Sequence, residues 1–287
     1  MNTLNKTKSI LNKYNIRANK RFGQNFLVDD AILNDIVEVS NVCSNDLVIE
    51  IGPGLGNLTN YILNKAGHAL LIEVDNNMIQ ILNDRFKEYN NYTLLNEDVL
   101  KINIDEQIKN IEAGLNKKFK SVKVVANLPY YITTPIIFKL LQEENRIDEI
   151  TVMVQKEVAE RMVARSKTKD YGILTLMVKY LSDANIEFIV PREAFVPSPN
   201  VTSAIITLKK NKKYKVKDEE TFFKLIHCSF AQRRKTMVNS LTGSRFRNLE
   251  KNEILEIFGK LDVDKNTRAE QLEIEDFIRI SDCFDNE

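Results

Sequence analysis

The chain has 287 residues, more than one hydrophobic core usually organises, so we expect two domains of unequal size. With 43% hydrophobic and 28% charged residues, the composition is typical of a folded protein and excludes a disordered or fibrous chain. The net charge of +1, from 41 Lys and Arg against 40 Asp and Glu, excludes a uniformly basic protein.

From residue 46 onward, short apolar runs alternate with helical patterns, which is typical of a parallel sheet covered on both faces. The predicted strands are Leu47–Ile51, Ala69–Val74, Tyr92–Leu95, Val122–Ala126, Ile150–Val154, Ile186–Val190 and Ala204–Leu208. The helices expected between them are Leu58–Lys65, Asn76–Tyr89, Pro135–Glu143, Lys156–Arg165 and Ile173–Tyr180. Seven strands with intervening helices predict a complete α/β domain of Rossmann-like type.

After Leu208 the strand patterns stop, and helical periodicity takes over. The predicted helices are Glu219–Phe230, Arg233–Leu241, Lys251–Phe258 and Ala269–Phe284. We therefore expect a basic N-terminal segment over residues 1–30, an α/β domain over 31–210 and a small all-helical domain over 211–287.

No window reaches the 18 consecutive apolar residues of a membrane span, and the first 30 residues lack the apolar stretch of a secretion signal. We therefore expect a cytoplasmic protein with no membrane association. The three cysteines are widely spaced and odd in number, which argues against a disulfide framework and against a zinc cluster. The sequence thus predicts buried thiols and no metal site.

The first predicted strand runs into a glycine-rich segment, Glu50–Thr59 (EIGPGLGNLT). Glycines at Gly52, Gly54 and Gly56 let the backbone turn tightly and approach a ligand. A dinucleotide loop has the spacing G-x-G-x-x-G and holds a pyrophosphate at the helix N-terminus. The spacing here is G-x-G-x-G with an acidic residue before it, which disfavours NAD and a phosphate ligand. The segment resembles the S-adenosylmethionine (SAM) loop of the seven-stranded methyltransferases, whose ligand carries a cationic sulfonium.

Two acidic residues follow the next two predicted strands. Glu73 comes 21 residues after Gly52, where a carboxylate can accept hydrogen bonds from both ribose hydroxyls of a nucleoside. Asp98 follows the third strand, where it can accept a hydrogen bond from an adenine amino group. Either acid alone is compatible with a solvated loop, but together with the glycine segment they predict SAM as cofactor.

The fourth predicted strand ends in Asn127, Leu128, Pro129 and Tyr130 (NLPY), which resembles the [D/N/S]-P-P-[Y/F] signature of amino methyltransferases. An exocyclic base amine is a poor nucleophile because its lone pair is delocalised into the ring. The Asn127 amide oxygen and the Leu128 carbonyl can accept its two N–H bonds and stabilise the positive charge that develops. Pro129 fixes the turn, and Tyr130 offers a ring for base stacking worth about 1 to 3 kcal/mol. The alternative is a plain strand-ending turn.

A second aromatic loop, Phe195–Val201 (FVPSPNV), precedes the last predicted strand. We expect Phe195 to close the other face of an extruded base, so that two rings and two acceptors clamp a purine. The predicted substrate is therefore an adenosine that is looped or flipped out of its helix.

Five segments together resemble the small-subunit ribosomal RNA adenine dimethyltransferases, the KsgA family. They are Arg21–Leu27 (RFGQNFL), Glu50–Thr59, Asn127–Tyr131 (NLPYY), Phe195–Val201 and Ser229–Thr236 (SFAQRRKT). The resemblance implies SAM-dependent dimethylation of the N6 amines of two adjacent adenosines in a hairpin loop near the 3′ end of 16S rRNA. It further implies that the substrate is the small ribosomal subunit or its precursor, and that the protein has a role in small-subunit biogenesis.

The resemblance also assigns roles to residues. The positions that match the family's SAM ligands are Asn25, Leu27, Gly52, Glu73, Asp98 and Asn127, and Gly54 joins them from the glycine segment. The expected catalytic set is Asn127, Leu128, Pro129, Tyr130 and Phe195.

The Erm family, which dimethylates an adenosine of large-subunit rRNA, is the first alternative, because it shares the Gln-Asn-Phe, glycine-loop and Asn-Pro-Tyr-type motifs. The run over residues 127–135 (NLPYYITTP) and the Ala-Gln-Arg-Arg-Lys-Thr segment are more similar to the small-subunit branch. The second alternative is an assembly factor that binds RNA without turnover, which the intact glycine segment and Asn127 disfavour. Methylation of DNA adenine or of a protein amide is disfavoured by the basic helical domain.

Charge is distributed unevenly along the chain, with net values of +4 over residues 1–30, −5 over 31–204, +9 over 205–247 and −7 over 248–287. Contacts of Lys and Arg with phosphates dominate affinity for nucleic acid, so the two basic zones predict RNA binding. The expected RNA contacts are Lys20 and Arg21 in the first zone, and Arg233, Arg234 and Lys235, which open a predicted helix in the second. The N-terminal pair could act as a lid that couples RNA arrival to cofactor enclosure. A single catalytic site suggests a monomer.

Overall fold

The computed structural model describes residues 2–16, 24–211 and 213–284. The chain divides into two compact units. The sheet unit comprises Met1–Ala159 and Ala184–Lys210, and the helical unit comprises Glu160–Asp183 and Asn211–Glu287.

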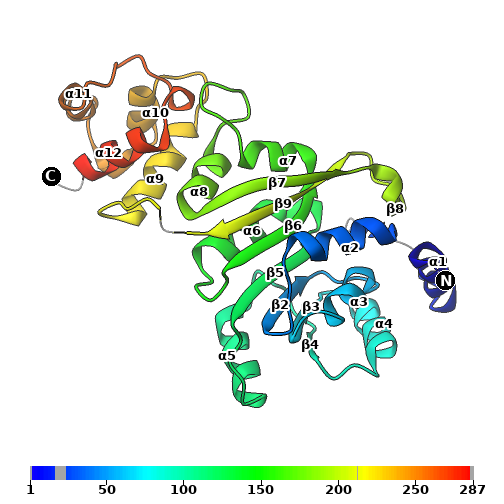
Figure 1. Cartoon of the computed structure of the whole chain (residues 1–287). Coiled ribbons are helices and arrows are strands. Elements are labelled where there is room, and N and C mark those ends of the chain that lie inside the picture. Colours follow the sequence, from blue (N-terminus) through cyan, green and yellow to red (C-terminus); the bar gives the residue numbers. More distant parts are fainter. Residues whose placement is uncertain (1, 17–23, 212, 285–287) are drawn as a thin grey trace. The chain divides into compact units, whose positions relative to one another are not determined.

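The sheet unit is built on a seven-stranded sheet in the order β4-β3-β2-β5-β6-β9-β7 (Figure 1). The strands are β2 (Asp46–Ile51), β3 (His68–Ile72), β4 (Tyr92–Leu95), β5 (Ser121–Asn127), β6 (Glu149–Gln155), β7 (Ser182–Val190) and β9 (Ser203–Lys210). Strands β2 to β6 pair in parallel, whereas β9 runs antiparallel to β6. The strand order reverses between β2 and β5, and ligands of open α/β sheets bind beside such a reversal, at the carboxyl ends of the strands.

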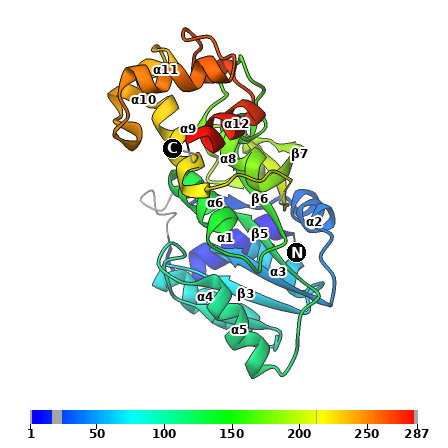
Figure 2. The ribbon, with the colours of Figure 1, turned by 90° about the vertical axis from the view of Figure 1, so that its left-hand side faces the viewer.

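Helices flank this sheet, as Figures 1 and 2 show. They are α1 (Thr3–Lys13), α2 (Asp30–Val39), α3 (Asn57–Leu63), α4 (Asn76–Phe86), α5 (Ile104–Gly114), η2 (Tyr130–Ile132), α6 (Thr133–Gln142), α7 (Lys156–Met162) and η3 (Arg192–Ala194). Every residue of β2 and β3 is buried, which requires cover on both faces of the sheet. One core joins Val48 and Leu71 of the strands to apolar residues of α2, α3 and α4, including the fully buried Leu33 and Ile62.

A second, two-stranded sheet lies outside the main one. It pairs β1 (Phe26–Leu27) with β8 (Phe195–Val196) in antiparallel register, so that Leu27 faces Phe195. The Val28 amide donates to the Ala194 carbonyl (2.8 Å) and extends the pairing by one bond. Two segments that are far apart in the chain are thereby held side by side.

The helical unit contains α8 (Ile173–Leu181), α9 (Glu219–Phe230), α10 (Met237–Gly243), η4 (Phe246–Asn248), α11 (Lys251–Lys260), η5 (Ala269–Gln271) and α12 (Ile274–Phe284). Their apolar faces share one core, in which the Tyr180 ring of α8 lies 4.7 Å from the Phe222 ring of α9, centroid to centroid. The Tyr171 hydroxyl donates to the Leu272 carbonyl (2.9 Å), which satisfies the polar end of a buried ring.

The seven predicted strands and the following helical region are confirmed, and the fold class is the predicted one. One strand departs from the parallel pattern that the sequence predicted, because β9 is antiparallel to β6. Residues 160–183, which the sequence pattern placed in the α/β domain, belong to the helical unit because α8 buries its apolar face against α9 and α12. The expectation of buried thiols is also wrong, since Cys43 is exposed and Cys228 and Cys283 are partly exposed. None of the described helices is long and apolar enough to cross a membrane.

Candidate active site

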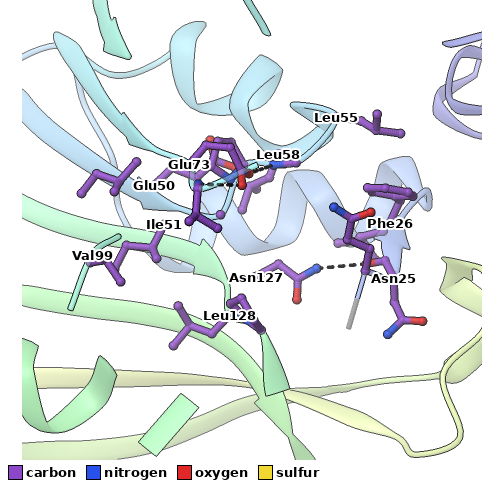
Figure 3. Close-up of a pocket in the computed structure, with 18 of the residues that line it drawn as sticks. Asn25, Phe26, Glu50, Ile51, Leu55, Leu58, Glu73, Val99, Asn127 and Leu128 are labelled. Atoms are coloured by element: carbon purple, nitrogen blue, oxygen red, sulfur yellow. Dashed lines mark hydrogen bonds between the residues drawn. The ribbon is translucent and has the colours of Figure 1, made fainter. Parts of the chain in front are cut away.

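A pocket opens at the carboxyl ends of the parallel strands β2 to β5, beside the reversal of strand order (Figure 3). It brings together the predicted residues Asn25, Leu27, Gly52, Gly54, Glu73, Asp98, Asn127, Leu128, Pro129 and Tyr130. Residues from five separate stretches of the chain therefore meet at one edge of the sheet, as strand-by-strand reasoning anticipates.

The glycine segment forms the floor of the pocket in a conformation that only glycine adopts readily. Gly52, Gly54 and Gly56 have φ of +66°, +55° and +78°. At Gly56, which precedes α3, an added Cβ would also lie 2.5 Å from the Phe86 ring. The absence of side chains at Gly52 and Gly54 leaves backbone atoms as the surface that a ligand meets.

Glu73 is buried at the end of β3, with 6% of its surface exposed. One carboxylate oxygen accepts from the Gly54 amide (3.0 Å), and the other accepts from the amides of Val74 and Asp75 (both 2.9 Å). Burial raises the pKa of Glu73, while these three backbone donors favour the charged form and act against that rise. The carboxylate is thus fixed in place, and the oxygen that accepts from Gly54 retains lone-pair capacity for a ligand.

Glu50 is a second buried carboxyl group in the pocket wall, at the end of β2. The Thr59 hydroxyl donates to it (2.6 Å). Burial raises its pKa to about 8, and the nearby Glu73 adds to the rise, whereas the Thr59 bond and the Arg85 charge oppose it. Glu50 is therefore largely neutral at neutral pH.

Asn127 is the last residue of β5, and its side chain points toward Asn25 (Figure 3). Its amide nitrogen donates to the Asn25 carbonyl (3.4 Å), which leaves its amide oxygen to accept from a ligand. The next residue, Leu128, donates its own amide to the Met153 carbonyl of β6 (3.2 Å), so the turn is anchored to the sheet.

The turn after Asn127 holds two tyrosines in different environments. Pro129 leads into η2, and its carbonyl accepts from the Ile132 amide (3.2 Å) and the Thr133 hydroxyl (3.0 Å). The Tyr130 ring is partly buried, and its hydroxyl lies 2.6 Å from the Ser203 hydroxyl at the start of β9. Tyr131 also lines the pocket and is 56% exposed.

Phe195 lies outside the predicted position. It pairs with Leu27 through the β1–β8 ribbon, but it is 3% exposed, belongs to the core under α2 and α3, and does not line the pocket. Its ring belongs to the same core as Leu27, which lines the pocket, and other residues form the pocket surface.

Helix α1 contributes to the pocket indirectly. The Asn57 side-chain amide at the start of α3 donates to the Thr7 hydroxyl of α1 and to the Leu27 carbonyl of β1, both at 2.9 Å. Apolar residues of α1 pack on Phe26 and Leu55, which line the pocket. Sequence reasoning predicted neither α1 nor these contacts.

The pocket fits a cationic nucleoside ligand better than a phosphorylated one. Glu73, Glu97 and Asp98 line it beside the largely neutral Glu50, whereas none of the described lining residues is Lys or Arg. Acidic groups suit the sulfonium and ammonium of SAM, and a diphosphate would require donors of the opposite charge. Exposed Val74, which directly follows Glu73 and was not predicted, adds an apolar surface of the kind that an adenine ring covers.

The predicted RNA contacts belong to two parts of the chain, of which the structure describes one. Lys20 and Arg21 are outside the described residues. Arg233, Arg234 and Lys235 are exposed in the helical unit, where Arg233 donates to the Lys169 carbonyl and lies 3.8 Å from Glu270. The expectation that they open a helix is wrong, because they form a turn before α10, whose first residue is Met237.

A Rossmann-like sheet of seven strands, with a glycine segment after its first strand, acids after the next two and Asn-Leu-Pro-Tyr after the fourth, defines a SAM-dependent amino methyltransferase. The sequence profile of the ribosomal RNA adenine dimethylases matches residues 15–286. The chain belongs to this family and is a SAM-dependent rRNA adenine dimethyltransferase.

Similar proteins agree with this assignment. The chain is 45% identical over 282 residues to a "Ribosomal RNA small subunit methyltransferase A" of Lachnoclostridium phytofermentans, which covers 97% of this chain and 96% of the relative. It is 44% identical to the protein of that name from Clostridioides difficile, with 98% and 95% covered. A dimethyladenosine transferase from Plasmodium falciparum has a similar structure, with a TM-score of 0.75, 27% identity and 91% and 98% of the two chains covered. The 23S rRNA methyltransferase ErmE shares the fold, with a TM-score of 0.65, 23% identity and 91% and 100% covered.

Proposed function

We propose that the chain dimethylates the N6 amines of two adjacent adenosines in the hairpin loop near the 3′ end of 16S rRNA, within the small ribosomal subunit or its precursor. It would act as a monomer in the cytoplasm, where small subunits are assembled, and contribute to their biogenesis. Relatives at 43–45% identity carry the name of a small-subunit methyltransferase, whereas the likeness to ErmE extends to the fold alone.

The observation that carries the proposal is the arrangement of Asn127. Its amide nitrogen is committed to the Asn25 carbonyl, so its oxygen is the atom available to an incoming amine. The Leu128 carbonyl is the next acceptor along the same anchored turn. Two acceptors on one amine hold its lone pair out of conjugation and stabilise the charge that grows on nitrogen during transfer.

The remaining residues hold the reactants in place. SAM supplies the methyl group; Glu73 would accept from its ribose hydroxyls and Asp98 from its adenine amine, while Asn25, Leu27, Gly52 and Gly54 complete the cofactor wall. Tyr130 would stack on the target adenine, with Phe195 supporting the wall behind. No base is needed before transfer, because the methylated amine is acidic enough to release its proton to water.

RNA would be bound outside the pocket as well. We propose that Arg234 and Lys235 contact phosphates, with Arg233 partly engaged within the helical unit and with Lys20 and Arg21 as further contacts. Such contacts supply affinity that depends on salt and carry little sequence information.

The test is methyl transfer from labelled SAM to small subunits that lack the modification, beside large subunits and free rRNA. Wild-type protein should label small-subunit adenosines as N6-dimethyladenosine. Asn127→Ala should lower kcat at least 100-fold, because a single preorganised acceptor of this kind is worth a factor of about 100 to 1,000. The thermal unfolding curve of the same variant serves as the control for folding.

The alternatives predict different results. Label on large subunits would move the assignment to the Erm type of reaction. Cofactor binding without transfer to any of the three RNAs would favour an assembly factor that does not catalyse methylation.

A further inference from the structure

The Tyr130 hydroxyl makes a hydrogen bond that the reaction described above does not use. Its oxygen lies 2.6 Å from the Ser203 hydroxyl, although 73 residues separate the two in the chain. Ser203 is fully buried at the first position of β9, opposite Gln155 of β6. A buried serine whose side chain is aimed at an active-site ring calls for an explanation beyond packing.

The surrounding geometry shows what this bond restrains. The backbone of Tyr130 is fixed because Leu128 is bonded to Met153 and the Pro129 carbonyl takes two donors. The far end of the ring is fixed only by Ser203, among the bonds described for this side chain. Strand β6 lies between β5, which leads into η2 and Tyr130, and β9, which begins at Ser203 (Figure 1). The phenol therefore reaches past the end of β6 to the start of β9.

We propose that Ser203 is a positioning residue for methyl transfer, whose hydroxyl holds the Tyr130 ring at both ends as a preformed platform for the target adenine. A ring that is held before the base arrives loses less freedom on stacking, so less of the stacking energy is spent on ordering it. The inference rests on the proposed function, since it assumes that Tyr130 stacks on the base.

Ser203 also links this platform to the second aromatic loop. It follows Phe195–Val201 by two residues, and that loop is braced by bonds from Ser198 to the Arg192 carbonyl (3.0 Å) and from Arg192 to the Asn200 carbonyl (3.4 Å). Residues 195–203 therefore carry both β8, which pairs with β1 beside the cofactor pocket, and Ser203, which is hydrogen-bonded to Tyr130.

The experiment is a double-mutant cycle of Ser203→Ala and Tyr130→Phe, measured as kcat and KM on unmethylated small subunits together with the Kd of S-adenosylhomocysteine. Each single change should lower kcat about tenfold, equivalent to about 1.4 kcal/mol, while the cofactor Kd stays within twofold. The double variant should be no slower than either single variant, because both remove the same bond.

A matched control lies on the same strand. Thr207 of β9 faces Thr151 of β6 with their hydroxyl oxygens 3.3 Å apart, and neither residue lines the pocket. Thr207→Val removes a hydroxyl pair of the same kind and should leave kcat, KM and the cofactor Kd unchanged.

Two results would overturn the inference. One is a Ser203→Ala variant that turns over as fast as wild type; the other is equal losses from Ser203→Ala in wild-type and Tyr130→Phe backgrounds, which would indicate a role independent of the ring. If Ser203→Ala does not fold, Tyr130→Phe tests the same hydrogen bond from the tyrosine, and full activity of that variant would also refute the inference. Failure of the proposed function can be told apart from these results, because the wild-type protein would then not label small subunits. The mutant cycle can in that case be run on whichever rRNA accepts the methyl group.

Discussion

Glu50 gives the protein a response to pH that can be traced to one side chain. Its carboxyl group is 2% exposed, and burial raises its pKa from 4.5 to about 8. In the unfolded chain the same group ionises near 4.5. The folded state therefore holds a proton that the unfolded state releases over this interval, and folding becomes less favourable as pH rises through it.

We predict that Glu50→Gln removes this dependence. The free energy of unfolding of the variant, relative to that of wild type, should rise steadily from about pH 5 to pH 8 and stay constant above pH 8. The total rise should be a few kcal/mol, because a shift of one pKa unit is worth about 1.4 kcal/mol. Chemical denaturation at several pH values measures the difference. Exposed Glu88→Gln on the surface is the control and should run parallel to wild type; a constant offset for both variants would contradict the prediction.

Single residues were predictable where chain order alone decides their position. Gly52, Glu73, Asp98 and Asn127 each follow a parallel strand, and the carboxyl ends of such strands must meet at one edge. Phe195 could not be placed in this way, because its position depends on the β1–β8 pairing, which has two residues on each side and no recognisable pattern. Only the fold decides that its ring turns into the core.

At the scale of elements, α1 is tied to the cofactor wall by polar bonds. Thr7 is fully buried, and its hydroxyl accepts a hydrogen bond from the Asn57 side-chain amide, which also donates to the Leu27 carbonyl. We predict that Thr7→Val releases α1, increases amide hydrogen exchange in residues 3–13 and weakens S-adenosylhomocysteine binding about three- to tenfold, the worth of one buried hydrogen bond of about 1 kcal/mol.

Exposed Ser9 on the same helix provides the comparison, and Ser9→Ala should leave exchange and affinity as they are in wild type. If Thr7→Val increases exchange in α1 without any loss of affinity, the helix is a separate element and does not shape the cofactor wall.

Two of the helices that the sequence did not predict, α1 and α5, share a physical cause. The buried positions of α1 are Thr3 and Thr7, and its apolar residues that pack on the rest of the sheet unit are only partly buried, so no continuous apolar stripe marks its buried face. In α5 the stripe of Ile104 and Ile108 continues with Glu112, a buried carboxylate that pairs with Arg146 (2.9 Å). Periodicity finds helices only when the buried face is apolar, and polar partners that complete such a face come from distant parts of the chain.

For the whole molecule, affinity for RNA should depend on charges in the helical unit. We predict that Arg234→Ala with Lys235→Ala weakens RNA binding and lowers the slope of log affinity against log salt by about 1 for each phosphate that is no longer neutralised. Binding assays from 50 to 300 mM salt measure the slope, and cofactor binding should not change. Lys87→Ala with Lys109→Ala removes two exposed charges from the sheet unit as a control, and an equal effect there would point to overall charge as the cause.

The interleaving of the two units along the chain constrains how the protein is made. Synthesis delivers α8 before β7 and β9, so the sheet unit is incomplete until residue 210 has left the ribosome. At that point the apolar face of α8, which carries Leu176 and Tyr180, is still uncovered. Its partners α9 and α12 are translated later. A nascent chain therefore carries α8 without its partners until α9 and α12 have been translated, and a gene cut after residue 210 would leave that helix permanently without them. The sheet unit, which carries the pocket, is compact in space but comes from two separate stretches of the chain, so no single cut in the gene isolates it.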